Sequence, residues 1–181
     1  MAIKTFTAGS VLTASDTNTF LANSGLVYVK SQTIGNGVFS VTVTDAFSST
    51  YDNYLIQVSG GSASAGCVLG LRLGADVTGY RYQFIYGDWA GTALADGTTV
   101  GTLFQYVGGA NTDGIHMNCT VNSPNLAKGT RVVADGVLPA NYSGFMGGYK
   151  PTTTQYTSFI IVPSTGSLTG GTITVYGYRK A

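Results

Sequence analysis

Apolar and polar residues alternate with a period of two in short runs along most of this chain. Val41 and Val43 alternate with threonines, and Ile173 and Val175 do the same near the C-terminus. Successive side chains of a strand point to opposite faces of a sheet, so this pattern predicts half-buried β-strands. We expect strands at 26–33, 37–44, 53–59, 66–73, 79–87, 99–107, 113–121, 128–134, 153–162 and 171–179, with a weaker candidate at 141–148.

Turn-forming residues separate these runs and limit the length of each strand. The turn signals are Gly35-Asn36-Gly37, Gly60-Gly61, Asp96-Gly97, Asp113-Gly114, Asp135-Gly136, Gly147-Gly148 and Gly170-Gly171. Many short strands, without a βαβ rhythm or a propeller-type repeat, predict an all-β fold. Our first choice is a jelly-roll-like antiparallel β-sandwich. We interpret residues 88–99, which contain Trp89, as a long exposed loop.

The chain carries few charges for its 181 residues. Only 9% of its residues are charged, and all 8 acidic residues are aspartates. Glutamate and lysine are common on exposed helix faces, so their scarcity argues against a helical protein. The formal net charge of +1 gives no reason to expect nucleic acid or an anionic membrane as a partner. A weakly charged surface tends to associate, which favours assembly.

Residues 1–25 depart from the β pattern. Thr13 and Asp16 have the spacing of a helix start, and the Asn-Ser-Gly sequence at 23–25 is typical of a helix end. We therefore predict an extended arm and a short helix at 14–22, followed by a β-sandwich domain at 26–181. The first residues have no apolar stretch, so we expect no secretion signal. No apolar run reaches the roughly 18 residues of a membrane span, so we expect no membrane insertion.

Few residues in the sequence could carry out catalysis. His116 is the single histidine, it lies on the more polar face of its predicted strand, and no nucleophile elbow accompanies it. Asp88 and Asp96 flank Trp89 and leave a hydrolase with two carboxylates open, although both aspartates also fit ordinary turn positions. The sequence therefore favours a protein without enzymatic activity.

The two cysteines, Cys67 and Cys119, each fall in a predicted strand. Two cysteines in a chain of this length do not make a disulfide framework, so we interpret them as small buried side chains. No group of histidine, cysteine and aspartate has the spacing of metal ligands. We expect neither a metal nor a cofactor.

Aromatic residues concentrate around the predicted strand at 79–87. Tyr80, Tyr82 and Tyr86 are separated by even numbers of residues, so they face one side of that strand, and Trp89 follows them. Such a stripe packs in the core, lies in a subunit interface, or stacks on sugars. The candidate residues for an outward or glycan contact are Tyr82, Tyr86, Asp88 and Trp89.

Several short segments of the chain resemble segments of one class of known proteins. The matching positions at the start are Phe6, Gly9, Val11, Leu12, Thr13, Ala14, Asp16 and Asn18, followed by the segments 47–54, 71–74 and 168–177. Together they resemble minor tail, appendage and capsid-decorating proteins of tailed bacteriophages. The pieces are scattered over most of the chain.

This resemblance implies a jelly-roll-like sandwich, no enzymatic activity and a homotrimer on the virion surface, in contact with capsid or tail proteins. It also implies that the N-terminal segment attaches the protein to the particle. The attachment candidates are Phe6, Val11, Leu12, Asp16, Phe20 and Leu21. The displayed sandwich would then be free to touch a host-surface glycan. A carbohydrate-binding, lectin-like module of a cell is the alternative that the aromatic residues leave open.

Overall fold

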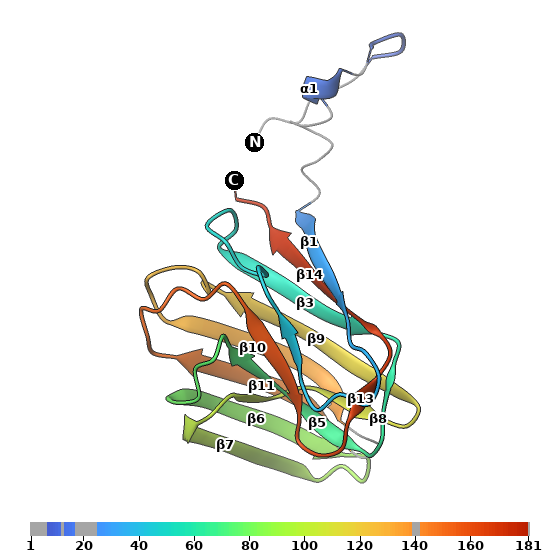
Figure 1. The fold of residues 1–181 in the computed structure, drawn as a ribbon, viewed down its shortest axis with the longest axis vertical. Helices are drawn as coiled ribbons and strands as arrows, with labels where there is room; N and C mark the ends of the chain where they lie inside the picture. The colour runs from blue at the N-terminus through green and yellow to red at the C-terminus, as the bar shows by residue number, and fades with distance from the viewer. Residues whose placement is uncertain (1–6, 12, 17–24, 139–141, 181) are drawn as a thin grey trace.

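The computed structural model describes residues 7–11, 13–16, 25–138 and 142–180. Within these residues the regular structure is almost entirely β-strand, and the strands pair in antiparallel fashion. The predicted all-β antiparallel sandwich is confirmed. Figure 1 shows the strands stacked across the domain, with β7 at one margin and β1 and β14 toward the other.

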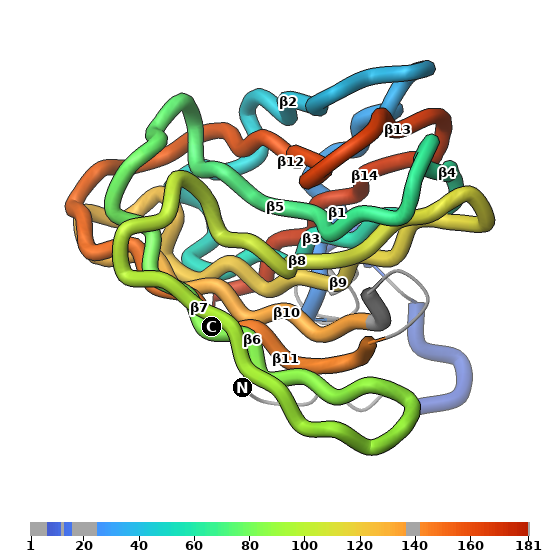
Figure 2. Tube along the Cα trace, turned by 90° about the horizontal axis from the view of Figure 1, so that it is seen from below, coloured from blue at the N-terminus to red at the C-terminus, as the bar shows by residue number. Residues whose placement is uncertain are grey.

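The strands form two layers that share one continuous hydrogen-bonding network. The larger layer has the order β1 (Leu26–Thr33), β14 (Thr172–Tyr178), β3 (Asn53–Ser59), β9 (Gly114–Asn122), β10 (Thr130–Leu138), β11 (Tyr142–Lys150), β6 (Tyr80–Asp88) and β7 (Ala93–Gly101). The smaller layer has the order β2 (Val41–Val43), β12 (Phe159–Pro163), β5 (Cys67–Leu73) and β8 (Phe104–Asn111). The hairpin of β8 and β9 joins the layers. In Figure 2, β2, β12 and β5 lie above β10, β11 and β6.

A short additional pair, β4 (Ser62–Ala63) and β13 (Leu168–Thr169), lies next to two tight turns. The turns at Gly60-Gly61 and Gly170-Gly171 pack against each other, and all four glycines have positive φ. A β-carbon on Gly61 would lie 2.4 Å from the carbonyl oxygen of Gly170. The sequence predicted both turns, and the structure adds that each excludes a side chain from the other.

Alternate side chains of the two layers meet in one core. Tyr54 and Ile56 of β3 in the larger layer and Leu69, Leu71 and Leu73 of β5 in the smaller layer are fully buried and belong to the same hydrophobic cluster. Burying each aliphatic side chain of this size stabilises the fold by roughly 1.5–3 kcal/mol. The period-two pattern thus had its predicted consequence, with one face of most strands inside.

The two cysteines behave as the sequence suggested. Cys67 and Cys119 are free and buried, with 3% and 0% of their surface exposed. Burial raises the pKa of both thiols. Since the thiolate is the reactive form, these side chains act as apolar core residues.

Several predicted boundaries were wrong, for reasons of tertiary pairing. The predicted strand at 37–44 is reduced to β2, and the one at 153–162 to its last part, β12. The single strand predicted at 99–107 is instead the end of β7, a turn and the start of β8. The turns predicted at 135–136 and 147–148 lie inside β10 and β11, which pair with each other over nine positions. Glycine is tolerated there because the flanking strands hold the ladder together.

The predicted loop at 88–99 was also wrong in its second half. Residues Ala93–Gly101 form β7, which pairs with β6 across Asp96 and Gly97. The Asp-Gly sequence suggested a turn, but the true turn lies at 89–92, where the amide of Gly91 donates to the carbonyl of Asp88. Pairing with β6 overrode the local preference of these residues.

The predicted helix at 14–22 is not seen as such. Of its residues, the structure describes only a single turn, α1 (Ala14–Asp16). Among the attachment candidates, Val11 is 81% exposed and Asp16 is exposed. Phe6, Leu12, Phe20 and Leu21 lie outside the described residues, so the attachment role of this segment stays a prediction.

A buried lysine is held by an aspartate at the end of the core. The Lys150 ammonium lies 2.8 Å from the Asp76 carboxylate, donates to the Thr78 carbonyl, and sits 4.7 Å from the centre of the Tyr80 ring. The Tyr156 hydroxyl donates to the same carboxylate at 2.9 Å. Although burial alone raises the pKa of Asp76, hydrogen bonds from Lys150, Thr78 and Tyr156 outweigh it and lower the pKa to about 2.

This arrangement predicts an acid-dependent loss of stability. Because the pKa of Asp76 is lower in the folded chain than its ordinary value of 3.8, the carboxylate stabilises the fold above pH 4. That contribution, about 2 kcal/mol, is lost as the pH falls from 4 toward 2. Urea unfolding of the wild type and of Asp76→Asn at pH 7, 4 and 2 measures it. The stability of the wild type should fall more steeply, and parallel pH profiles would contradict the prediction.

Candidate functional site

The tyrosines of β6 share one side of the strand, as their spacing predicted, and that side is the inner side of the larger layer. Tyr80 is fully buried, and its hydroxyl accepts from the Leu73 amide at 2.8 Å. Burial raises the pKa of Tyr80. Tyr82 and Tyr86 are only partly buried. Of the three explanations left open, core packing therefore holds for Tyr80.

Two aromatic residues that the sequence analysis did not select complete this stripe. Phe84 is buried and stacks between Tyr86, at 4.7 Å and 12°, and Tyr106 of β8, at 4.6 Å and 9°. Phe84 has the same even spacing as the tyrosines, so its place in the stripe could have been found in the sequence. Tyr106 comes from another strand, and no local pattern links it to β6.

Tyr106 reaches β6 and β7 because β8 bulges. Leu69 and Leu71 are two residues apart on β5. Their partners on β8, Gly108 and Phe104, are four residues apart, so β8 contains two extra residues at this point. Tyr106, inside this bulge, has a φ of 66°, which is unusual for a residue other than glycine. Bulges of this kind re-aim side chains next to functional sites.

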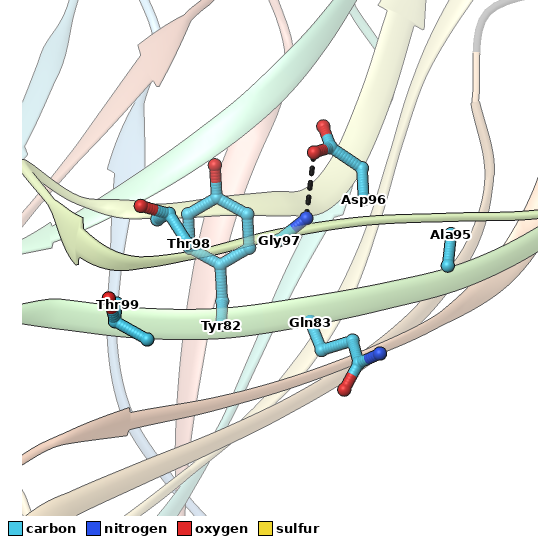
Figure 3. A pocket seen from close by; sticks show the side chains of 7 residues that line it. All are labelled: Tyr82, Gln83, Ala95, Asp96, Gly97, Thr98 and Thr99. Atoms are coloured by element: carbon cyan, nitrogen blue, oxygen red, sulfur yellow. Dashed lines mark hydrogen bonds between the residues drawn. The ribbon is translucent and has the colours of Figure 1, made fainter.

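The hairpin of β6 and β7 presents a row of polar groups beside these rings. Direct partners in an antiparallel pair share a face, so Thr98 lies beside Tyr82, and Asp96 beside Phe84. Figure 3 shows Tyr82, Asp96 and Thr98 on one side of the hairpin and Gln83 on the other. The dashed line in Figure 3 is the hydrogen bond of 2.7 Å from the Gly97 amide to the Asp96 carboxylate.

These side chains also bond to the bulge. The Tyr106 hydroxyl donates to Asp96, and the Tyr82 hydroxyl donates to the Gln105 side-chain oxygen at 3.2 Å. Burial, together with the nearby Asp96 carboxylate, raises the pKa of both Tyr106 and Tyr82. We call this set of residues the tyrosine groove: Tyr82, Asp96, Thr98, Gln105 and Tyr106.

Asp88 and Trp89 occupy the turn at the far end of the same hairpin. An Asp88 side-chain oxygen accepts from the Thr92 amide at 2.8 Å. This hydrogen bond is the main cause that lowers the pKa of Asp88. Trp89 is 65% exposed. The structure therefore brings Tyr82 together with Asp96, but places Trp89 outside the groove.

Asp88 and Asp96 lie at different places on the β6–β7 hairpin, and each has its own partners. Asp88 accepts from the Thr92 amide in the turn. Asp96 pairs with Phe84, four residues before Asp88 on β6, and accepts from Gly97 and Tyr106.

His116 lies on the outer face of the larger layer, as its position in the pattern predicted. It lines a hollow of about 470 Å³ with Asp135, Ser143 and Phe145, among others. No hydrogen bond among the described side chains joins His116 to Ser143 or Asp135. Asp135 accepts instead from the Asn118 amide at 3.2 Å. The three residue types of a hydrolytic triad meet here without the contacts that a triad requires.

Large apolar side chains stand exposed on this outer face. Phe145 of β11 is 70% exposed, and its cross-strand neighbour Ile85 of β6 is 62% exposed. Val133 of β10, one strand away on the other side, is 53% exposed. We call these three residues the apolar outer face. An exposed aromatic residue in the middle of a sheet, with apolar neighbours, is typical of an interaction surface.

Charged and polar groups surround the apolar outer face. At one end the guanidinium of Arg131 lies 5.1 Å from the centre of the Tyr149 ring, and both residues line a second hollow of about 470 Å³ together with Arg81. At the other end lie Asp135 and His116. An apolar centre with an aromatic and charged rim is the usual anatomy of a protein–protein interface. The sequence analysis missed Phe145 because the surrounding glycines made its segment a weak strand candidate.

Comparison of the chain with family models, curated proteins and solved structures gave no match. In the described part of the chain, no three metal-ligating side chains gather in one place. The described residues also contain no helix of the length and hydropathy needed to cross a bilayer.

Proposed function

We propose that this protein is a non-enzymatic structural component of a bacteriophage virion, displayed on the particle as a minor tail, fibre-type or capsid-decorating protein. The resemblance of its terminal segments supplies the virion part of the proposal. The apolar outer face supports a function exerted through surface contact. Phe145, 70% exposed in the middle of a sheet, is the observation that carries it.

The contact that we propose is with further copies of the same chain, as a homotrimer. Residues near a three-fold axis meet their own copies, so one apolar patch is sufficient to hold three subunits together. With 9% charged residues, the surface offers little repulsion to keep copies apart. Burial of Phe145 and Ile85 would remove the most exposed large apolar side chains of β11 and β6 from water.

Immunolabelling tests the location on the virion. Antibody raised against the purified chain is applied to particles made from the phage genome that encodes it, and the particles are imaged by negative-stain electron microscopy. Label on the capsid or the tail supports the proposal and separates its variants. Particles without label, alongside a labelled major capsid protein as control, would contradict it.

The oligomeric state gives a separate prediction. Light scattering should find the wild type at three times the 18.7 kDa mass of one chain, and Phe145→Lys should shift it toward the single-chain mass. Loss of one buried aromatic ring per subunit weakens association by about 100-fold. Lysine suits the test because the cross-strand partner of Phe145 is Asp135, so the new charge is paired within the folded chain.

Phe39→Lys is the matched control for this experiment. Phe39 is 74% exposed but lies in the segment before β2, on the other layer, so its replacement should leave the mass unchanged. A wild type that is a monomer, or a Phe145→Lys variant that keeps the wild-type mass, would contradict assembly through the apolar outer face.

A further inference from the structure

The tyrosine groove lies on the opposite side of β6 and β7 from the apolar outer face. It opens at the margin of the sandwich, where β7 is the last strand of its layer and nearly all of its residues are exposed. The inner side of β7 is therefore reachable from solvent beside β8. A ligand bound there would not compete with subunits packed on the outer face.

Two adjoining hollows make up the groove. One, of about 640 Å³, lies at the margin of the hairpin and is lined by Tyr82, Asp96 and Thr98 and also by Gln83, which points to the other side (Figure 3). The second, of about 490 Å³, is lined by Tyr82, Thr98 and Gln105, and on the smaller layer by Val162 and Ser164. Tyr82 and Thr98 border both hollows, and the second, between the two layers, is by itself large enough for a monosaccharide.

The polar groups of the groove are already held in place. Asp96 takes one hydrogen bond from Gly97 and one from Tyr106, which leaves about two of the four acceptor positions of a carboxylate unused. The Gln105 oxygen receives the Tyr82 hydroxyl, so the amide nitrogen of Gln105 keeps its two donors. Side chains fixed in this way lose little conformational freedom when a ligand binds.

The chemistry of the lining selects the class of ligand. It offers a carboxylate, hydroxyls, an amide and tyrosine rings, and none of the residues that line the two hollows is a lysine, an arginine or a histidine. A phosphate, a sulfate or an acidic sugar would meet Asp96 with no cation to compensate its charge. A neutral sugar can donate hydroxyls to Asp96 and place its apolar face against a ring.

We propose that the tyrosine groove binds a neutral saccharide, with Asp96 as the main acceptor, Thr98 and Gln105 as supporting polar contacts, and Tyr82 as the central ring. The bulge in β8 supports this assignment. It holds Tyr106 at a positive φ, and in doing so it brings both Tyr106 and Gln105 to the groove. Backbone strain maintained by the surrounding fold is a mark of functional sites. The proposal depends neither on the virion location nor on the oligomeric state.

Saturation-transfer NMR on the full chain tests the ligand class. The probes are the methyl glycosides of glucose, galactose, mannose and N-acetylglucosamine, together with the uronic acids of the first three as matched anions. We expect transfer to at least one neutral glycoside and weaker transfer to its uronic acid. No transfer to any neutral glycoside, or stronger transfer to an acid than to its neutral counterpart, would overturn the proposal.

Two variants and one control locate the bound sugar. Asp96→Asn should raise the Kd of the best neutral glycoside by about tenfold or more, since it removes a charged acceptor. Asp113→Asn, the same change in the exposed turn between β8 and β9, should leave the Kd unchanged. If the two aspartate variants bind alike, the groove is not the site.

Tyr82→Phe keeps the ring and removes only the hydroxyl, so it serves as a second variant if Asp96→Asn alters the thermal unfolding of the hairpin. It should raise the Kd severalfold at an unchanged Tm. An unchanged Kd in this variant would overturn the role assigned to Gln105, whose side chain the Tyr82 hydroxyl holds. Trp89→Ala, in the exposed turn, separates this groove from an aromatic contact at the end of the hairpin, and a loss of binding in that variant would place the sugar there instead.

Discussion

Replacing Asp76 by asparagine should destabilise the fold by about 2 kcal/mol or more at neutral pH, because it leaves a buried ammonium without its counter-ion. The side chain of Lys150 is 5% exposed and lies 2.8 Å from the Asp76 carboxylate. Asparagine preserves the size of the side chain and can still accept from Tyr156, so the change isolates the charge. Urea denaturation, followed by the fluorescence of the single tryptophan, measures the loss.

The double variant Asp76→Asn with Lys150→Met is the decisive control. It removes the unpaired charge, so its stability should lie well above that of Asp76→Asn alone. A single variant that costs less than about 1 kcal/mol, or a double variant no more stable than the single one, would show that the ion pair is not what holds this end of the core.

The second large effect is expected at Gly61. Alanine there should cost about 3 kcal/mol or more, since its β-carbon would lie 2.4 Å from the Gly170 oxygen in a residue with a φ of +77°. Backbone atoms on both sides would have to move, and the β4–β13 pair lies directly beyond them. Thermal unfolding of the variant, compared with the wild type, measures the cost.

Gly37 provides the matched comparison. Its φ is +64°, similar to that of Gly61, but a β-carbon at Gly37 would have nothing within 4 Å. Gly37→Ala should therefore cost only the conformational part, roughly 1–2 kcal/mol. The difference between the two variants measures the close approach of the turns. Equal losses would mean that the backbone at Gly61 relaxes freely.

Strands could be predicted well wherever burial follows the alternation of residues. Tyr54 and Ile56, for example, alternate with polar or less buried neighbours, and both are fully buried. The predictions failed where a strand contains glycine and aspartate. Asp96 and Gly97 form a strand because β6 supplies a partner, and a turn signal read from the sequence contains no information about that partner.

In the candidate site, too, some residues could be predicted from local spacing and others only from strand pairing. Tyr82 and Tyr86 were selected from their even spacing, which is a local property of one strand. Asp96, Gln105 and Tyr106 became part of the groove only through the β6–β7 pairing and the bulge in β8. Phe145 was missed because the glycines around it made its segment a weak strand candidate, and its exposure follows from the burial of the opposite face of β11.

By itself, the sequence determined an all-β chain with one buried face on most strands, two buried cysteines and a shared face for the β6 tyrosines. Each of these follows from the period of two or from the chemistry of single residues. Only the tertiary structure decided that β7 extends the larger layer, that Lys150 is buried against Asp76, and that two different surfaces flank β6. The reason is physical: strand partners and their register depend on residues far apart in the chain, whereas alternation depends only on neighbours.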